Sequence, residues 1–239
     1  MKIRKYKHKN EVSYALGATL VYELLNCQPE SITRVFINTK AEQTESIKRL
    51  VEKIRLNNIL IEQSDKAFNI LSPKENCFVI AEFRKTKKVL ENGSHIVLVN
   101  PSDAGNLGTI IRTAIGFGIN NIAIIKPAVD HYDPRTIRAS MGAIFHSNIE
   151  YFNSIEEYIQ RFPKNIRYAF MLTAKASLSK IDINEPFSLI FGNEATGLSN
   201  NYHDICLDVR IFHSSNIDSL SLPMAAGIAM YEFTKELWK

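Results

Sequence analysis

The segment Leu189–Ser199, "LIFGNEATGLS", holds the feature that decides how this 239-residue chain is organised. A short apolar run, typical of a buried strand, ends at Gly192 and is followed at once by the carboxylate of Glu194. Glycine permits tight turns and close backbone approach, whereas an unpaired charge inside a sheet is costly. Two interpretations stand: a tight turn with a solvated glutamate, or a strand exit that carries a functional carboxylate.

Outward from this segment, the C-terminal part of the sequence alternates between apolar runs and helical patterns. Such alternation predicts an α/β fold with a parallel sheet covered on both faces. The runs "HIVLVN" (95–100), "NIAIIK" (121–126), "RYAFMLT" (167–173) and "CLDVRIF" (206–212) are the further expected strands. Helices are expected over 106–118, at the start of 133–145, over 154–162 and over 220–237.

The first ninety residues form a second α/β series. Strands are expected at 32–38, 58–63 and 77–83, and helices at 11–26, 44–56 and 64–71. The charged segment 84–92 has the composition of a linker and is closed by Gly93. The sequence thus predicts two domains, a small α/β domain at 1–90 and a parallel-sheet domain at 91–239.

Positive charge is concentrated in the N-terminal part. The net charge is +4, and residues 1–92 carry 17 Lys and Arg against 11 Asp and Glu. The excess lies mainly in "KIRKYKHK" (2–9) and "FRKTKK" (83–88). Clusters of this kind suit a phosphate backbone, although a solvated tail and a charged linker would give the same pattern.

The cysteines and the N-terminus bear on the compartment. Cys27, Cys77 and Cys206 are far apart and lack metal-ligand spacing, which predicts reduced thiols and no bound metal. The basic start has no apolar run after it, and no apolar stretch approaches the ~20 residues needed to span a bilayer. We therefore expect a soluble, cytoplasmic protein.

The expected strand exits carry the candidate functional residues. Ligands of parallel sheets bind at the carboxyl ends of the strands. After the first strand of the C-terminal series, Gly105 and Gly108 flank Asn106 at a predicted helix start, where backbone amides can meet an anion. The spacing differs from the dinucleotide and P-loop fingerprints. Arg112 is either a surface ion-pair residue or a placed guanidinium.

Three segments together resemble a known family. "DAGNLGTIIRTAIGFG" (103–118), "LIFGNEATGLS" (189–199) and "IDSLSLPMAAGIAMYEF" (217–233) are similar to the ordered motifs of SpoU/TrmH-type RNA 2′-O-methyltransferases of the SPOUT superfamily. The resemblance covers roughly residues 94–239. The first ninety residues resemble, more loosely, the small RNA-binding domain that many members carry.

This resemblance implies an architecture and a reaction. It implies a deep trefoil knot in the parallel-sheet domain, S-adenosylmethionine bound in the knot, a homodimer, and methyl transfer to a ribose 2′-oxygen of ribosomal or transfer RNA. The implied catalytic residues are Arg112, Asn106, Glu194 and Ser219. The implied cofactor-binding residues are Thr173, Gly192, Asn193, Ile211, Leu220 and Ser221.

The implied role of Arg112 has two versions. In the family proposal the arginine acts as a base for the 2′-hydroxyl, whereas a guanidinium that stays protonated is better suited to hold the adjacent phosphate. Either version predicts loss of turnover without loss of cofactor binding when Arg112 is replaced.

The sequence departs from the family pattern at two places. The third motif usually has Ser-Leu-Asn, and here Ser221 stands in place of the asparagine. The usual Ile-Pro-Met before it is "IFH", Ile211–His213. A catalytically silent RNA-binding protein therefore stays open as the alternative, and cofactor binding separates the two readings. A nucleotide-dependent oxidoreductase is opposed by the missing glycine fingerprint.

Overall fold

The chain divides into two compact units. The computed structural model describes residues 3–41, 44–72 and 77–238. The first unit comprises Met1–Thr86 and Asp130–His146, and the second comprises Lys87–Val129 and Ser147–Lys239. Each contains a sheet and helices, so the fold is α/β. In the described ranges, no helix has both the length and the apolar character needed to cross a membrane. The predicted domain boundary at residue 90 stays a prediction.

The first unit is built on a four-stranded sheet in the order β1-β4-β2-β3. The strands are β1 (Val12–Leu16), β2 (Ile32–Ile37), β3 (Ile61–Gln63) and β4 (Val79–Arg84). β4 runs antiparallel to both of its neighbours, and β2 and β3 are parallel. β2, β3 and β4 overlap with the strands expected at 32–38, 58–63 and 77–83.

The helices of the first unit are α1 (Ala18–Cys27), α2 (Glu45–Leu56), α3 (Asp65–Leu71) and α5 (Pro134–Ala139), with short 3₁₀ turns η1 (Pro29–Ser31) and η2 (Ala143–His146). Thr44 and Ser64 cap α2 and α3 with their side chains, and Asp133 caps α5. α2 is amphipathic, with Leu50 and Ile54 buried.

One expected helix is wrong in its first half. Residues 11–26 carry an apolar stripe of helical spacing, but Val12–Leu16 form β1, paired with β4 from Val12 to Leu16. Gly17 then takes a φ of 112°, which ends the strand and allows α1 to begin at Ala18. Pairing with a neighbouring strand outweighs the local helical pattern here.

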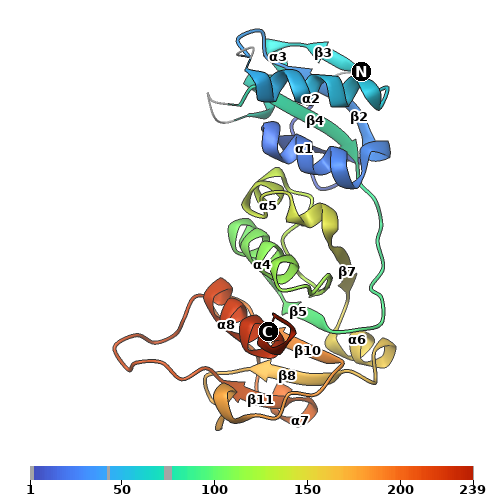
Figure 1. The fold of residues 1–239 in the computed structure, drawn as a ribbon. Coiled ribbons are helices and arrows are strands. Elements are labelled where there is room, and N and C mark those ends of the chain that lie inside the picture. The colour runs from blue at the N-terminus through green and yellow to red at the C-terminus, as the bar shows by residue number, and fades with distance from the viewer. Residues whose placement is uncertain (1–2, 42–43, 73–76, 239) are drawn as a thin grey trace. The chain divides into compact units, whose positions relative to one another are not determined.

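The second unit contains a fully parallel, seven-stranded sheet in the order β7-β6-β5-β10-β8-β11-β9. Its strands are β5 (His95–Val99), β6 (Asn121–Ile125), β7 (Asn148–Phe152), β8 (Ile166–Phe170), β9 (Ala176–Ser177), β10 (Phe187–Phe191) and β11 (Leu207–Arg210). Figure 1 shows β10, the strand of the segment 189–199, between β5 and β8. All five residues of β10 are buried.

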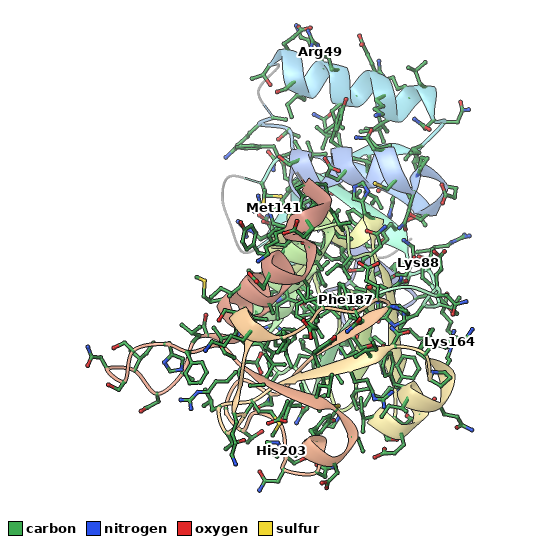
Figure 2. All side chains as sticks on the ribbon, turned by 60° about the horizontal axis from the view of Figure 1, so that its bottom comes forward. Arg49, Lys88, Met141, Lys164, Phe187 and His203 are labelled. Carbon is green, nitrogen blue, oxygen red and sulfur yellow. The ribbon has the colours of Figure 1, made fainter. Side chains whose placement is uncertain are left out.

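Helices cover both faces of this sheet. The helices are α4 (Ala104–Gly116), α6 (Ile155–Arg161), α7 (Tyr202–Ile205) and α8 (Leu222–Thr234), with 3₁₀ turns η3 (Leu178–Lys180) and η4 (Lys235–Trp238). Tyr158 of α6 and Tyr202 of α7 belong to one buried cluster. On the other face, Phe233 of α8 packs against Phe187 of β10. In Figure 2, Phe187 lies among the packed side chains of the second unit, whereas Lys164 of the same unit is exposed and points outward.

A directed chain of hydrogen bonds lies within the α6 face. Nε2 of His95 is 2.8 Å from the carbonyl of Glu91, which only accepts, so Nε2 donates. Nδ1 therefore accepts from the Tyr158 hydroxyl at 2.8 Å. Tyr158 is 2.6 Å from the Ser188 hydroxyl, and Asn165 donates to that hydroxyl. Burial lowers the pKa of His95, opposed by the bond to Glu91, so the imidazole is neutral.

Candidate functional site

A pocket of about 240 Å³ lies where β8, β10 and β11 end. Because the strands are parallel, their carboxyl ends meet at one edge of the sheet, and the start of α8 reaches the same place. The pocket is lined by Phe170–Leu172, Phe191–Gly197, Val209, Ile211, His213, Ser219, Leu220, Leu222 and Ala225. The walls are mixed, with somewhat more apolar than polar surface, and the polar side chains come from the loop after β10 and from the segment before α8.

The loop after β10 is held in one tight conformation. Oδ1 of Asn193 accepts the backbone amides of Ala195 and Thr196, at 2.9 and 3.2 Å. The Gly197 amide donates to the carbonyl of Asn193 at 2.9 Å. A Cβ on Gly192 would lie 2.2 Å from the carbonyl carbon of Gly197, so the loop closes on itself only because residue 192 has no side chain.

Glu194 is fastened to the start of α4. Its Oε2 accepts from the hydroxyl of Ser102 at 2.9 Å and from the Ser102 amide at 3.2 Å. Its Oε1 accepts from the amide of Asp103 and from the side chain of Asn106, both at 3.3 Å. The carboxylate also faces the positive end of the α4 dipole.

These contacts set the charge state of Glu194. Burial would raise the pKa of the carboxyl, but hydrogen bonds from backbone amides, from the Ser102 hydroxyl and from Asn106 outweigh it. The pKa therefore lies below its usual range. Glu194 is half-buried, and it accepts hydrogen bonds from the start of α4, so the carboxylate braces the pocket loop. The functional role of this carboxylate stays a prediction.

The structure brings several of the predicted site residues together. Four of the predicted cofactor residues line the pocket, and so do two of the predicted catalytic residues: Gly192, Asn193, Ile211, Leu220, Glu194 and Ser219. Asn106 reaches this group through its bond to Glu194.

The other predicted site residues lie outside the pocket lining. Thr173 is exposed, with its hydroxyl 3.1 Å from Nε2 of His203. Ser221 is exposed at the N-cap of α8 and makes no side-chain capping bond. Arg112 is exposed on α4, and its side chain has no hydrogen bond or ion pair with any residue in the described ranges.

His213 is a pocket residue to which the sequence assigned no role. Its Nδ1 is 3.0 Å from the Ser214 carbonyl, so Nδ1 carries the proton and donates. Its Nε2 is then an acceptor, and this atom is buried without a hydrogen-bond partner among the described residues. The sequence did hold a sign of this residue: in "IFH", Ile211–His213, the histidine stands where the SpoU/TrmH-type pattern usually has the methionine of Ile-Pro-Met.

The arrangement suits an amphipathic small molecule. Apolar side chains such as Met171, Ile211 and Leu222 offer surface to a flat ring or a thioether, while Asn193 and His213 offer polar contacts at the rim. Backbone groups of the 192–197 loop stand beside them. Among the described residues of the pocket no pair of carboxylates and no metal-ligand cluster is found.

Comparison with known proteins shows which family and which relatives this chain is similar to. Residues 93–231 match the model of the SpoU rRNA Methylase family. An uncharacterized tRNA/rRNA methyltransferase of Synechocystis is 30% identical over 146 residues, which cover 60% of this chain and 53% of that protein. A 23S rRNA (uridine(2479)-2′-O)-methyltransferase of Streptomyces viridochromogenes is 27% identical over 156 residues, covering 62% and 54%. The chain spans about half the length of both relatives.

A solved structure matches nearly the whole chain. The AdoMet-bound rRNA methyltransferase from Sinorhizobium meliloti superposes with a TM-score of 0.80 at 26% identity. The match covers 95% of this chain and 88% of the other. Both units of the present structure therefore have counterparts in a single solved protein.

Proposed function

The chain belongs to the SpoU rRNA Methylase family, and from this premise we propose that it transfers a methyl group from S-adenosylmethionine to a ribose 2′-hydroxyl of RNA, most simply ribosomal RNA. The observation that carries the proposal is the pocket built from the 192–197 loop and the segment before α8. It lies within the matched residues and at the strand ends where the fold binds ligands.

The pocket residues fit S-adenosylmethionine. The Gly192 turn leaves backbone groups accessible where a Cβ would collide, and the lone pair on Nε2 of His213 needs a donor. The cofactor carries such donors in its amino and hydroxyl groups, and it has an adenine ring for the apolar walls. When bound, it supplies a methyl group activated by the sulfonium. Gly192, Asn193, Ile211, Leu220 and His213 would hold it, with Thr173 and Ser221 at the margins.

The groups that manage the RNA hydroxyl stand at the rim. Ser219 lines the pocket and is exposed, so its hydroxyl can contact the incoming ribose. Glu194 orients the loop and holds Asn106 beside it. Arg112 has an unengaged guanidinium among the described residues, and we assign it to the phosphate next to the target ribose, where it also stabilises developing alkoxide charge.

The first unit is proposed to select the RNA. Lys5, Lys7 and Lys9 are exposed, as is Arg84 at the end of β4. Exposed cations on a small α/β unit suit a phosphate backbone, whose contacts position a nucleic acid. An RNA substrate would place the activity in the cytoplasm.

A homodimer and a knot are part of the same proposal. Met224, Ile228 and Tyr231 occupy one face of α8 and are 56%, 37% and 55% exposed, an apolar stripe that a second copy of the chain would cover. The segment after β11 lines the same pocket as the loop after β10 and leads into α8, which packs on α4. Figure 1 shows this segment extending from the sheet before it returns to α8. This return path is where the trefoil knot would form.

Calorimetric titration with S-adenosylmethionine tests the proposal, followed by a methylation assay on unmodified ribosomal RNA. We expect one cofactor bound per chain and methyl incorporation into ribose 2′-oxygens. A folded protein that binds RNA but no cofactor, with or without RNA present, would instead be a silent RNA-binding protein.

A further inference from the structure

A second cluster of chemically active side chains lies in the first unit, in a set of residues that the methyl-transfer chemistry does not use. Glu23 and Cys27 are one turn apart on α1, and His146 ends η2. One ligand atom from each residue lies within 4.8 Å of the other two. Cys27 and His146 are 119 residues apart in sequence.

The three ligand atoms converge on one point. Sγ of Cys27 is 3.1 Å from Nε2 of His146, and the same Nε2 is 3.3 Å from Oε2 of Glu23. Tetrahedral Zn²⁺ with bonds of about 2.3 Å to sulfur and about 2.0–2.1 Å to nitrogen and oxygen puts its ligand atoms roughly 3.3–3.6 Å apart. The Sγ–Nε2 and Nε2–Oε2 separations of 3.1 and 3.3 Å lie close to this range, and the third pair, Sγ and a Glu23 oxygen, lies within 4.8 Å.

A catalytic relay would need a different arrangement. In a thiol–imidazole–carboxylate relay the thiol and the carboxylate face opposite ring nitrogens, so that one nitrogen takes a proton while the other donates. Here Sγ of Cys27 lies 3.1 Å from Nε2 and 3.6 Å from Nδ1, and Oε2 of Glu23 lies 3.3 Å from the same Nε2, so the thiol and the carboxylate do not face opposite nitrogens. An imidazole nitrogen, a thiolate and a carboxylate gathered in this way are instead a ligand set that one divalent cation satisfies, with the two negative charges balanced.

The site is held in place by its surroundings. A Cβ on Gly142 would lie 2.8 Å from Cβ of Glu23, so the backbone at 142 approaches the stem of that side chain closely. Gln28, next to Cys27, donates from Nε2 to the carbonyl of Phe145 at 2.8 Å. These contacts fix α1 against η2 through neighbours of the ligands, as preorganised sites require. The side chains of His146 and Glu23 are 46% and 37% exposed, so an ion can enter from solvent.

We propose that Glu23, Cys27 and His146 bind one Zn²⁺ ion, with water in the fourth position. Thiolate, imidazole and carboxylate are the donors that Zn²⁺ accepts, and hard cations such as Mg²⁺ are disfavoured by the sulfur. The ion is a cross-link between α1 and the segment 143–146. Binding breaks the S–H bond of Cys27 and releases its proton to solvent, while the sulfur bonds to the ion as a thiolate.

The test uses the full-length protein, stripped of metal by a chelator and kept reduced with a phosphine. Zn²⁺ is titrated in competition with a chromophoric chelator, and Co²⁺ is added separately as a spectroscopic probe. We expect one Zn²⁺ per chain, a rise in Tm on its addition, and a thiolate-to-Co²⁺ charge-transfer band with tetrahedral d–d bands.

The variants Cys27→Ser, His146→Ala and Glu23→Gln probe the ligands. Loss of even an outer partner of a metal ligand costs about 10–100-fold in affinity, so each variant should lose at least about 10-fold. Cys27→Ser should also abolish the charge-transfer band. Cys206→Ser is the matched control, since Cys206 is likewise half-buried and lies outside the cluster.

Two results would overturn the proposal. One is Zn²⁺ affinity in the wild type no higher than in Cys27→Ser. The other is a Co²⁺ spectrum unchanged by Cys27→Ser or lost equally in Cys206→Ser. Circular dichroism of each variant shows that it is folded, and cofactor binding in the second unit is measured in parallel, so failure here is distinct from failure of the proposed methyl transfer.

Discussion

Ser102 and Glu194, 92 residues apart, are joined by two hydrogen bonds to a single carboxylate oxygen, 2.9 Å from the hydroxyl and 3.2 Å from the amide. The first residue precedes α4 and the second belongs to the pocket loop, so the two are coupled through this oxygen. Ser102 does not line the pocket, but a substitution there is expected to affect the pocket through Glu194.

Ser102→Ala should raise the pKa of Glu194 toward its ordinary value of about 4.3, because one bond to the ionised form is lost. A carboxyl whose folded pKa is lowered contributes stability that is present above the unfolded pKa and lost as pH falls through the folded pKa. The difference in free energy of unfolding between wild type and Ser102→Ala should thus shrink on acidification below about pH 4.

Urea unfolding at a series of pH values measures that difference. Ser215→Ala, at an exposed serine, is the control. A difference that stays constant across the acid range would show that the charge of Glu194 is not involved.

Gly192→Ala should disrupt the pocket. The new Cβ would lie 2.2 Å from the Gly197 carbonyl carbon and 2.4 Å from its oxygen, both backbone atoms that cannot swing away. We expect a loss of about 1–3 kcal/mol in stability and loss of S-adenosylmethionine binding, measured by thermal unfolding and calorimetry. Gly116→Ala is the matched control: its Cβ meets nothing within 4 Å and alanine favours the helix. Normal cofactor binding by Gly192→Ala would show that S-adenosylmethionine binding does not depend on the tight conformation of the 192–197 loop.

His213→Ala should weaken binding of S-adenosylmethionine. No described residue donates a hydrogen bond to the buried Nε2 of His213. Under the proposal a donor on the cofactor bonds to this atom, and that donor would lose its partner in the variant. The expected cost is about 1–2 kcal/mol, roughly 5- to 30-fold in Kd. Calorimetry on His213→Ala and on His8→Ala, a histidine of the first unit, makes the comparison. Equal affinity of the two variants would mean that Nε2 does not contact the cofactor.

Arg112→Ala and Arg112→Lys should lower turnover by about 100-fold or more while the Kd for S-adenosylmethionine stays unchanged. Lysine keeps the charge but lacks the planar fork that grips a phosphate through two bonds. Methyl incorporation into RNA and calorimetry provide the two readouts, and Arg49→Ala on α2 is the control at another exposed arginine. Near-normal methylation by both Arg112 variants would remove the residue from the mechanism.

His95 should make stability depend on pH just below neutrality. Burial lowers its folded pKa below the unfolded value of about 6.5, so the unfolded chain binds more protons in that interval. The free energy of unfolding should therefore fall as pH drops through about 6.5 toward the folded pKa. Above about pH 6.5 the contribution of His95 to stability should be fully present. Denaturant unfolding of wild type and His95→Gln at pH 5.5 and 7.5 measures the slope, which should be smaller in the variant. Equal slopes would contradict the assignment.

Sequence periodicity recovered the strands that are buried on both faces. β5, β6 and β10 are mainly apolar and almost wholly buried, and short apolar runs of this kind are typical of central strands in a parallel sheet. It failed at β1, because "VSYAL" carries a helical stripe together with Gly17, and only the pairing with β4 settles the choice. A local pattern carries no information on a partner strand that lies 64 to 72 residues further along the chain, from Leu16 paired with Ile80 to Val12 paired with Arg84.

The site was predictable where it depends on chain order and hidden where it depends on contacts. Gly192 and Glu194 stand out because a glycine and a carboxylate break an apolar strand. The bonds from Ser102 to Glu194 and the convergence of Cys27 with His146 join segments that are distant in sequence, and no spacing rule connects them. The buried nitrogen of His213 likewise becomes visible only once the pocket is closed around it.

The position of β10 between β5 and β8 has a consequence for synthesis on the ribosome. β5, β6 and β7 can pair with one another as soon as they emerge, but β8 is made next and finds neither of its neighbours, since β10 and β11 come later in the chain. The nascent sheet therefore carries the open edges of β5 and β8 until residues 187–191 appear. Translational pausing in the interval 171–191 would prolong the exposure of these edges, and a chaperone that shields unpaired strands would act in that interval.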